Sequence, residues 1–469
     1  MRDIALTLII LGILPFAAYR TWIGVLLWTW LSVMSPHRLT YGFAYSMPWA
    51  QMAALATFIS FFVDRQGRKM IWTAPVISLA LFVVWMCITT AFAVHVGPSA
   101  DQLKKVLKIQ LFTLIAFAVI RDRKHIELFV WVNALAVGFY GFKGGLFVLR
   151  SGGGERVWGP AGSFIAGNNE VGLAIIMVIP LLYFLRQFAT KRWIRNGLLA
   201  VMVLGVVAAI GTYSRGAFLA IAAMGLVLWW RSPGRLVNGV VIVVIATLVL
   251  SFMPQKWADR MSTIETYQQD NSAMGRINAW TMAYNLANHR ALGAGFEAGT
   301  EDLFRKYAPI PQARAAHSIY FQVLGEHGWV GLGLFLSIGA FGFMTAARVR
   351  RRAKKVPEAQ WVYNLAGMLQ VSMVGYAVGG AFLSLAYFDL PYNVLVILVA
   401  CDRWMAEERW RTDTVGVLGS VATLGRKPPR PAPAAPSSST AGPAALHPEL
   451  PAGTWSAGTG KAGRPARDG

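Results

Sequence analysis

The sequence is poor in charge. Only 14% of its 469 residues are charged, whereas an ordinary soluble domain has about 25%. Hydrophobic residues make up 55% of the chain. No water-soluble fold needs so much apolar surface, so the composition excludes a soluble enzyme and a disordered chain for the residues before about 410.

Cysteine is nearly absent as well. Cys87 and Cys401 both lie in apolar runs, which predicts neither a disulfide framework nor a metal site. The sequence also has no HExxH, no paired DxD in the predicted outer loops, no P-loop and no dinucleotide fingerprint. We therefore expect a protein that uses no metal and no cofactor.

The chain consists mainly of long apolar runs separated by short polar segments. Lipid leaves backbone groups no partner outside the segment, so the runs predict helices, each about 20 residues long. Residues 4–34 are interrupted by Pro15 and Arg20 and form either one broken helix or a hairpin of two short ones. Counted as one unit, they give an all-α polytopic protein of about twelve spans. The other runs are 49–63, 75–96, 103–120, 126–149, 169–187, 197–213, 214–230, 236–253, 317–347, 358–380 and 388–405.

Lys and Arg predict the orientation, because short cytoplasmic loops retain positive charge. Five clusters are separated by even numbers of spans, so all five can face the cytoplasm, with the N-terminus also inside and an even number of spans before residue 64. This placement accounts for much of the net charge of +22 without nucleic acid as a partner. The clusters are Arg65, Arg68 and Lys69; Arg121, Arg123 and Lys124; Lys191, Arg192 and Arg195; Arg231 and Arg235; and Arg348, Arg350, Arg351, Arg352, Lys354 and Lys355.

Two regions then fall on the outer side, at about 150–168 and 254–316. The second carries seven Lys or Arg and six Asp or Glu, a net of +1, and is too long to be a mere turn, so we expect it to be functional. Ile277, Trp280 and Tyr284 would share one face of a helix that lies on the membrane surface or packs on the spans. Residues 1–410 would form the transmembrane domain, with the N-terminus as a retained span, and the Pro-, Ala- and Ser-rich residues 411–469 a disordered cytoplasmic tail.

Two arginines at the outer side are candidate anion-binding residues. Arg215 lies in GTYSRGAFLA, where two apolar helices meet almost without a loop, and Arg276 lies in MGRINAW within the long outer region. A guanidinium can bind phosphate in a bidentate manner. The alternatives are snorkelling to lipid headgroups for Arg215 and a solvated loop side chain for Arg276.

The candidate base is His317, where the long outer region re-enters the membrane. Histidine titrates near neutral pH and can take a proton from a hydroxyl, although an interfacial histidine with a structural role is the alternative. His327 follows ten residues later, about 15 Å along a continuous helix, so the two histidines would not share one small site.

Weaker candidates for substrate binding surround the same face. Lys143 and Arg156 could hold an anionic headgroup or snorkel. Asn168 could be an N-cap or, with Asn169, could bind sugar hydroxyls at the mouth of a span. Asp389 is either a loop aspartate before Pro391 or a partner for one of the arginines.

These segments, taken in order, resemble the O-antigen ligase family of membrane glycan transferases (Wzy/WaaL type). The match lies in GPAGSFIAGNNEVGLAIIMVIPLLYF, then YSRGAFLA, then GRINAW with HRALGAGFEAG, and last AHSIYFQVLGEHGWVGLGLF. It covers about residues 160–345. One departure is Ser318, where many members have Asn after the histidine. The opening LPFAAYRTWIGVLLWTWLSVMSPHRLTYG is similar to a branch of O-glycosylation ligases linked to exosortase systems.

The resemblance implies a GT-C-like arrangement and a metal-independent glycosyltransferase at the periplasmic face of the bacterial inner membrane. Arg215 and Arg276 would hold the diphosphate of an undecaprenyl-diphosphate-linked glycan, and His317 would deprotonate the acceptor hydroxyl, most simply that of lipid A-core. A protein O-oligosaccharyltransferase and a polysaccharide polymerase share this chemistry. A transporter of lipid-linked glycan is a different class, and it would need binding residues near the midplane.

Overall fold

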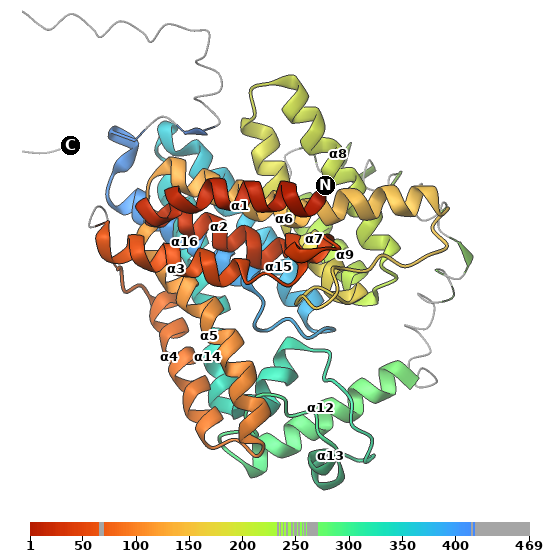
Figure 1. Ribbon diagram of the computed structural model, residues 1–469. Helices are drawn as coiled ribbons and strands as arrows, with labels where there is room; N and C mark the ends of the chain where they lie inside the picture. The colour runs from red at the N-terminus through yellow and green to blue at the C-terminus, as the bar shows by residue number, and fades with distance from the viewer. Residues whose placement is uncertain are drawn as a thin grey trace, which may run out of the picture. The chain divides into compact units, whose positions relative to one another are not determined.

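The computed structural model describes residues 1–64, 70–231 and 271–413, scattered residues between 234 and 259, and residues 416 and 417. Within these residues every regular element is helical (Figure 1), as the apolar runs predicted. The α-helices are α1 (Arg2–Tyr19), α2 (Thr21–Met34), α3 (Trp49–Val63), α4 (Ala74–Ala91), α5 (Val96–Val119), α6 (Arg123–Arg150), α7 (Asn168–Phe188), α8 (Arg192–Gly211), α9 (Arg215–Arg231), α12 (Asn271–His289), α13 (Glu301–Tyr307), α14 (Ile319–Ala353), α15 (Gln360–Gly380) and α16 (Asp389–Ala406).

Six of the described helices are long and apolar enough to cross a membrane: α1, α4, α6, α7, α8 and α14. The chain is thus a multi-pass membrane protein, and these helices account for half of the twelve predicted spans. Helices α2, α3 and α9 are apolar but short, with 14, 15 and 17 residues. Helix α16 is not among the six, and it carries the charged residues Asp389, Asp402 and Arg403. The predicted span at 236–253 and the predicted tail at 411–469 lie mostly outside the described residues.

Residues 4–34 form two helices. Pro15 lies inside α1, and the chain breaks at Arg20, which has extended backbone angles. The carboxylate of Asp3 accepts hydrogen bonds from the backbone N–H groups of Gly42 and Ala44, at 2.9 and 3.1 Å, whereas Arg20 lies 3.7 Å from Asp64. Helices α1, α2 and α3 therefore run between the same two ends, and the chain passes from one end to the other three times before residue 64. The even number of spans expected before this residue is not found.

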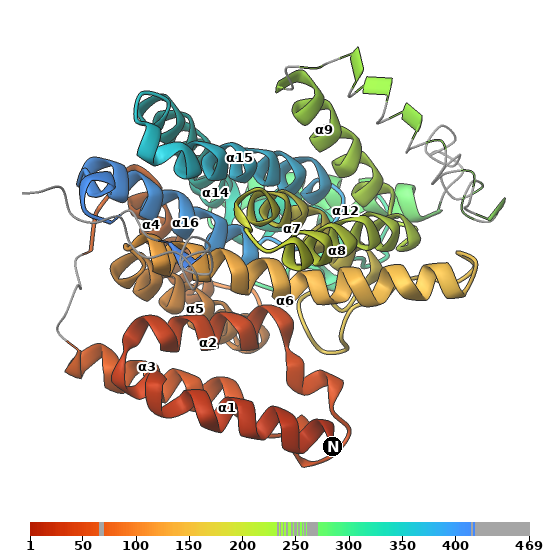
Figure 2. The ribbon, with the colours of Figure 1, turned by 90° about the horizontal axis from the view of Figure 1, so that it is seen from above.

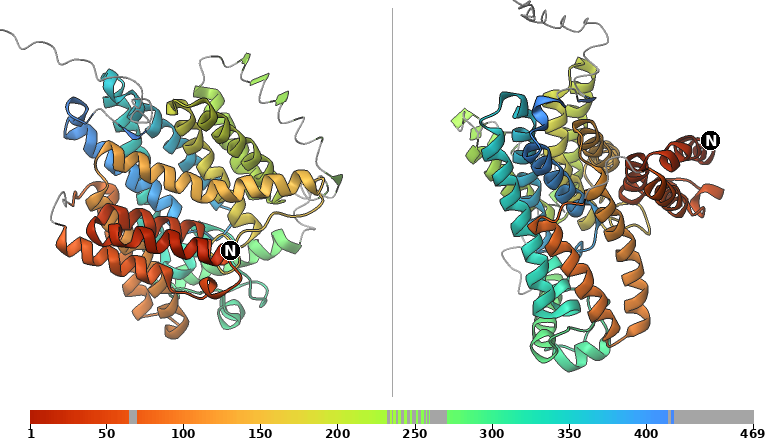
Figure 3. Two further views of the ribbon diagram at one scale, coloured as in Figure 1. Left: turned by 45° about the horizontal axis from the view of Figure 1, so that its top comes forward. Right: turned by 90° about the vertical axis from the view of Figure 1, so that its left-hand side faces the viewer.

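The first three helices share a small core of their own. Leu6 and Ile10 of α1 cluster with Leu27 and Leu31 of α2 and with residues of α3. Helix α2 also contacts α5 and α6, which places the three helices on one flank of the bundle (Figure 3).

The centre of the bundle is α7, which packs against α6, α8, α9 and α15 (Figure 2). Of the apolar stretch that makes α7 a candidate span, 72% is buried inside the protein, a larger share than in any other candidate span among the described helices. The packing is close because small residues face it: a Cβ on Gly172 would lie 3.1 Å from the Cβ of Ala217 on α9. This contact sets α7 and α9 side by side at the end where Arg215 begins α9.

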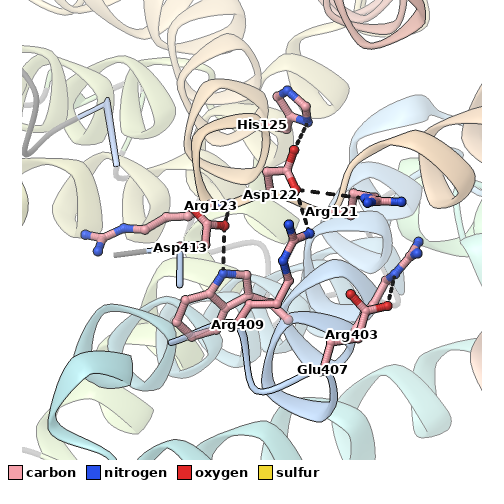
Figure 4. Close-up of polar contacts among 9 residues, drawn as sticks. Arg121, Asp122, Arg123, His125, Arg403, Glu407, Arg409 and Asp413 are labelled. Atoms are coloured by element: carbon pink, nitrogen blue, oxygen red, sulfur yellow. Dashed lines mark hydrogen bonds and ion pairs between the residues drawn. The ribbon is translucent and has the colours of Figure 1, made fainter. Parts of the chain in front are cut away.

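One end of the bundle gathers the basic clusters, and we call it the basic end. Asp122, just before α6, lies 2.6 Å from Arg409 and 3.4 Å from His125, and Asp413 accepts a hydrogen bond from the backbone N–H of Arg123 at 2.8 Å (Figure 4). These contacts join the start of α6 to the end of α16. A polar cavity of about 390 Å³ beside them is lined by Arg20, Asp64, Arg121 and Asp122, among others.

The later clusters lie at the same end. Asp402 of α16 pairs with Arg348 at 3.2 Å and Arg352 at 3.4 Å. The side-chain oxygen of Gln370 accepts hydrogen bonds from Arg231 and Arg350 at 3.1 and 3.2 Å. Three of the five predicted clusters thus share one end. The first cluster, at 65–69, lies outside the described residues.

Helix α14 is broken at Gly328, whose angles of φ 66° and ψ −170° are accessible almost only to glycine. The chain between α12 and α13 docks at the break: the backbone N–H groups of Ala294 and Gly295 donate to the carbonyl oxygens of Gly325 and Glu326, at 3.0 and 2.9 Å. Residues 319–327 and 329–353 are therefore two segments, and the continuous helix expected here is wrong.

The outer region carries two helices with a core of their own. Apolar side chains of α12 cluster with Leu303, Phe304 and Tyr307 of α13. Trp280 of α12 stacks on Phe321 at 5.0 Å, with an interplanar angle of 7°. Helix α12 thus packs on α14. Of the two predictions for its apolar face, the one in which it packs on the spans is confirmed, and not the one in which it lies on the membrane surface.

Candidate functional site

Arg215 is placed by a tight turn between α8 and α9. Tyr213 has φ 59°, in the left-handed region, and this residue reverses the chain within three positions. The hydroxyl of Ser214 accepts a hydrogen bond from the backbone N–H of Ala217 at 3.2 Å, which makes Ser214 the N-cap of α9. Arg215 is the first residue of that helix, where the macrodipole disfavours a cation. Its charge adds to that of the helix N-terminus and creates a positive site for an anion.

Residues from the first outer region hold this turn in place. The hydroxyl of Tyr213 donates to the carbonyl oxygen of Gly153 at 2.6 Å. The side-chain amide of Asn168 donates to the carbonyl oxygen of Thr212 at 2.8 Å. Gly167, and not Asn168, is the N-cap of α7, so the expected capping role of Asn168 is wrong. Its amide is instead used to position the turn before Arg215.

Arg276 lies in the second turn of α12 and shares an apolar cavity with Arg215. The cavity measures about 240 Å³. Gly216 lets the wall approach closely, because a Cβ there would lie 2.9 Å from the Cβ of Phe382. The cavity therefore has two arginine residues in an otherwise apolar lining. Its lining is Arg215, Leu219, Ala273, Arg276, Ile277, Trp280 and Phe382.

A second cavity of about 330 Å³ also has Arg276 in its lining, and this one is polar. Arg276 thus lines both cavities. The structure places Arg215 in one of them and His317 in the other. The lining is Ser272, Gly275, Arg276, Gln312, Ala313, Arg314, Ala315 and His317.

His317 is held in a strained backbone conformation at the entry to α14. It has φ 44°, which is rare for a residue with a side chain. The neighbouring carbonyl of Ala316 accepts a hydrogen bond from the indole N–H of Trp280 at 2.7 Å, and Ser318 is the N-cap of α14. The segment is thus fixed from both sides of His317, and α12 supplies one of the two anchors.

The electrostatic setting of His317 suits a base. Burial of the imidazole lowers its pKa below 6.5, and the positive charge of Arg276 lowers it further. The ring is therefore neutral at pH 7. Its Nδ1 atom is buried and has no hydrogen-bond partner among the described residues.

His327 has a structural role in comparison. It is fully buried, its Nδ1 atom lies 2.7 Å from the hydroxyl of Thr89, and its ring packs edge-to-face on Phe296. His327 lines neither of the two cavities that contain Arg276.

The weaker candidates are spread more widely. Lys143 is exposed on α6, and neither cavity has it in its described lining. Arg156 is exposed, and its guanidinium lies 5.7 Å from the ring centre of Tyr213. Asn169 is half-buried in the first turn of α7. Asp389 is buried and accepts a hydrogen bond from the hydroxyl of Ser32 at 2.6 Å, so its described partner is a serine and not one of the arginines.

Sequence reasoning missed two contributors to the site, Arg314 and Gln312, and it named a third, Glu170, only as part of the polar cluster that begins α7. Arg314 and Gln312 line the polar cavity beside His317. Glu170, at the start of α7, is within electrostatic reach of Arg276. The segment QARAAHS carried a signal for Arg314, since it lies three residues before His317, but nothing in the pattern separated it from the other arginines of the region.

The helices and the paired cavities define a multi-pass membrane protein with a cationic site at the end of the bundle opposite the basic end. Residues 200–336 match the family model described as O-antigen ligase, and residues 1–190 match a family of unknown function (DUF5935). The O-antigen ligase match includes Arg215, Arg276 and His317.

Two further comparisons add little. The curated proteins contain no match. A solved structure described as "Structural coordination of polymerization and crosslinking by a peptidoglycan synthase complex" is similar at 17% identity and a TM-score of 0.36. The match covers 71% of this chain and 99% of that chain. A likeness this distant has no bearing on the function.

Proposed function

We propose that this protein is a glycosyltransferase that moves a glycan from undecaprenyl diphosphate to an acceptor hydroxyl at the periplasmic face of the bacterial inner membrane. One observation carries the proposal: Arg276 lines an apolar cavity together with Arg215 and a polar cavity together with His317. A lipid-linked donor needs an apolar approach that ends at positive charge. A hydroxyl acceptor needs a polar approach that ends at a base.

The donor diphosphate would lie against Arg215 and Arg276. Guanidinium groups bind phosphate oxygens through charge-assisted hydrogen bonds, and the apolar surroundings strengthen that attraction because they exclude water. Negative charge grows on the diphosphate as the glycosidic bond breaks. Preorganised positive groups then stabilise the transition state more than the ground state.

The acceptor hydroxyl would reach His317 from the polar cavity. His317 takes the proton as the acceptor oxygen forms a bond to the anomeric carbon, and the bond from that carbon to the diphosphate oxygen breaks. Undecaprenyl diphosphate leaves with the electron pair. A single displacement of this kind inverts the anomeric configuration, and the two arginines supply the charge stabilisation without a metal ion.

The acceptor distinguishes three versions of this function. Lipid A-core oligosaccharide is our first choice, and a protein hydroxyl or a growing polysaccharide would use the same groups. The similarity of the opening segment to the exosortase-linked O-glycosylation branch implies little about the acceptor. A transporter of lipid-linked glycan is disfavoured because the arginines lie at helix ends, whereas transporters bind near the midplane.

The experiment is a transfer assay with the purified protein and an undecaprenyl-diphosphate-linked glycan. Lipid A-core, a second lipid-linked repeat and a serine-rich periplasmic protein serve as parallel acceptors. His317→Ala should lower the rate by about 10²–10⁴-fold, and Arg215→Ala should abolish transfer in a folded protein. His289→Ala is the matched control, since His289 lies on α12 outside both cavities. Donor binding without product from any acceptor would instead favour a transporter.

A further inference from the structure

Arg314 lines the polar cavity, although the proposed chemistry at Arg276 and His317 does not need it. It lies on the segment between α13 and α14 and packs against α12: a Cβ on Gly275 would lie 2.7 Å from the Cδ atom of Arg314. Its guanidinium donates a hydrogen bond to the side-chain oxygen of Gln312 at 3.4 Å. The absence of a side chain at Gly275 thus leaves the room that Arg314 occupies beside Arg276.

The charge of Arg314 has no acidic partner among the described residues. Other arginines in the protein differ in this respect, since Arg305 pairs with Glu301 at 3.5 Å and Arg348 pairs with Asp402 at 3.2 Å. The described lining of the polar cavity holds Arg276, Arg314 and a histidine, and no carboxylate. The cavity is therefore positive and suited to an anion.

The position of His317 indicates which substrate brings that anion. A general base must lie within hydrogen-bond reach of the proton that it takes. His317 lines the polar cavity and not the apolar one, so the acceptor hydroxyl must enter the polar cavity. The proposed function places the donor diphosphate against Arg215 and Arg276, which line the apolar cavity. A group that contacts Arg314 therefore belongs to the acceptor.

We propose that Arg314 binds an anionic substituent, a phosphate or a carboxylate, that the acceptor carries close to its reactive hydroxyl, and that the protein thereby selects acidic acceptors. This inference rests on the proposed glycosyltransferase function. Arg314 acts as a specificity residue, because it contacts the acceptor away from the atoms that react. Its planar fork suits both phosphate and carboxylate.

The test compares Arg314→Gln, Arg314→Lys and the wild type with matched acceptors. One acceptor is lipid A-core with its phosphates, a second has the phosphates removed, and a third has its carboxyl groups reduced to alcohols. Arg305→Gln is the control, because Arg305 is an exposed arginine of the same outer region and lines neither cavity. Binding of each glycolipid to the full chain without donor is measured in parallel.

Arg314→Gln should raise the acceptor KM by about ten- to a hundredfold, with kcat and the donor KM nearly unchanged. The wild type should prefer the acidic acceptor to one of the two neutralised acceptors, and this preference should disappear in Arg314→Gln. If the disfavoured acceptor is the one without phosphates, the recognised group is a phosphate; if it is the one with reduced carboxyl groups, the recognised group is a carboxylate. Arg314→Lys should restore part of the preference, and Arg305→Gln should behave as wild type.

The outcomes that overturn the inference differ from those that overturn the proposed function. If the wild type transfers glycan equally well to acidic and neutral acceptors, or if Arg314→Gln keeps the preference, Arg314 is not a specificity residue although transfer is real. If the wild type makes no product, the proposed function fails. The binding measurement still decides then, because equal binding of the acidic glycolipid by wild type and Arg314→Gln overturns the anion site itself.

Discussion

The side-chain amide of Asn168 donates a hydrogen bond to the backbone carbonyl of Thr212, at 2.8 Å. This bond joins the first residue of α7 to the turn before Arg215. Gly172, one turn further along α7, packs against the side chains of Thr212 and Ala217. The position of Arg215 is therefore set by contacts from α7 as well as by its own helix.

The first prediction concerns this bond. Asn168→Ala should leave the Thr212 carbonyl without its amide donor, which costs about 1–3 kcal/mol when the group is buried. We expect a lower melting temperature and a lower kcat, because the turn can then shift Arg215. Asn169→Ala is the control for melting alone, since Asn169 is half-buried on the same turn. Wild-type kcat in Asn168→Ala would show that the turn holds Arg215 without this bond.

The second prediction concerns the pH dependence. The proposed function makes the neutral form of His317 the active base, and burial and the charge of Arg276 lower the pKa of this imidazole from 6.5. Transfer, measured as kcat/KM, should therefore be lost as the pH falls through this lowered pKa, at a lower pH than for an ordinary histidine.

Variants of Arg276 provide the control for that profile. Arg276→Gln removes one of the causes of the lowered pKa, so the acidic limb of the residual activity should move to higher pH. Arg276→Lys keeps the charge and should keep the limb where it is. An acidic limb that does not move in Arg276→Gln would show that this charge does not act on the base.

The third prediction tests the break in α14. A Cβ on Gly328 would lie 2.1 Å from the carbonyl oxygen of Ala291, and its backbone angles also exclude a side chain. We expect Gly328→Ala to destabilise the protein by at least about 2 kcal/mol, seen as a fall in melting temperature in detergent. Gly333→Ala is the matched control on the same helix, because nothing lies within 4 Å of the added Cβ. Equal melting temperatures would contradict the broken helix.

The fourth prediction concerns which side of the membrane the N-terminus faces. Asp3 lies beside Gly42, opposite the basic end that holds Arg348 and Arg352. In a background without Cys87 and Cys401, Arg2→Cys and Ser46→Cys should react with an impermeant maleimide in intact spheroplasts. Lys354→Cys should react only after permeabilisation. Labelling of Arg2→Cys only in permeabilised cells would restore the expected cytoplasmic N-terminus.

Apolar run lengths predicted many helices well, because the spans depend mainly on local composition. The run at 49–63 coincides with α3, and the runs at 358–380 and 388–405 differ from α15 and α16 by two residues or fewer at each end. The break at Gly328 could not be predicted in this way. It depends on the segment 291–295, which supplies N–H groups to α14 from a distant part of the chain.

The candidate site, too, could be predicted from the sequence only in part. Arg215 and His317 could be chosen from the sequence because each is a polar residue at the predicted outer boundary of an apolar run, and Arg276 because it lies in the long outer region. That Arg276 would line a cavity with each of the other two could not be predicted, since α12 is positioned by Trp280, which stacks on Phe321 and donates a hydrogen bond to the carbonyl of Ala316. Arg314 was missed because its role comes from the space beside Gly275.

The shared position of Arg276 has a consequence for the order in which substrates are used. The positive charge of Arg276, which we propose holds the donor diphosphate, also lowers the pKa of His317 and so weakens it as a base. A bound diphosphate would neutralise that charge and raise the pKa of His317, so the base would gain strength only once the donor is in place. Water that enters the polar cavity beforehand would meet a weak base and no donor to attack. Such a protein would load its donor first and its acceptor second, and wasteful hydrolysis would be suppressed by the same guanidinium group that promotes transfer.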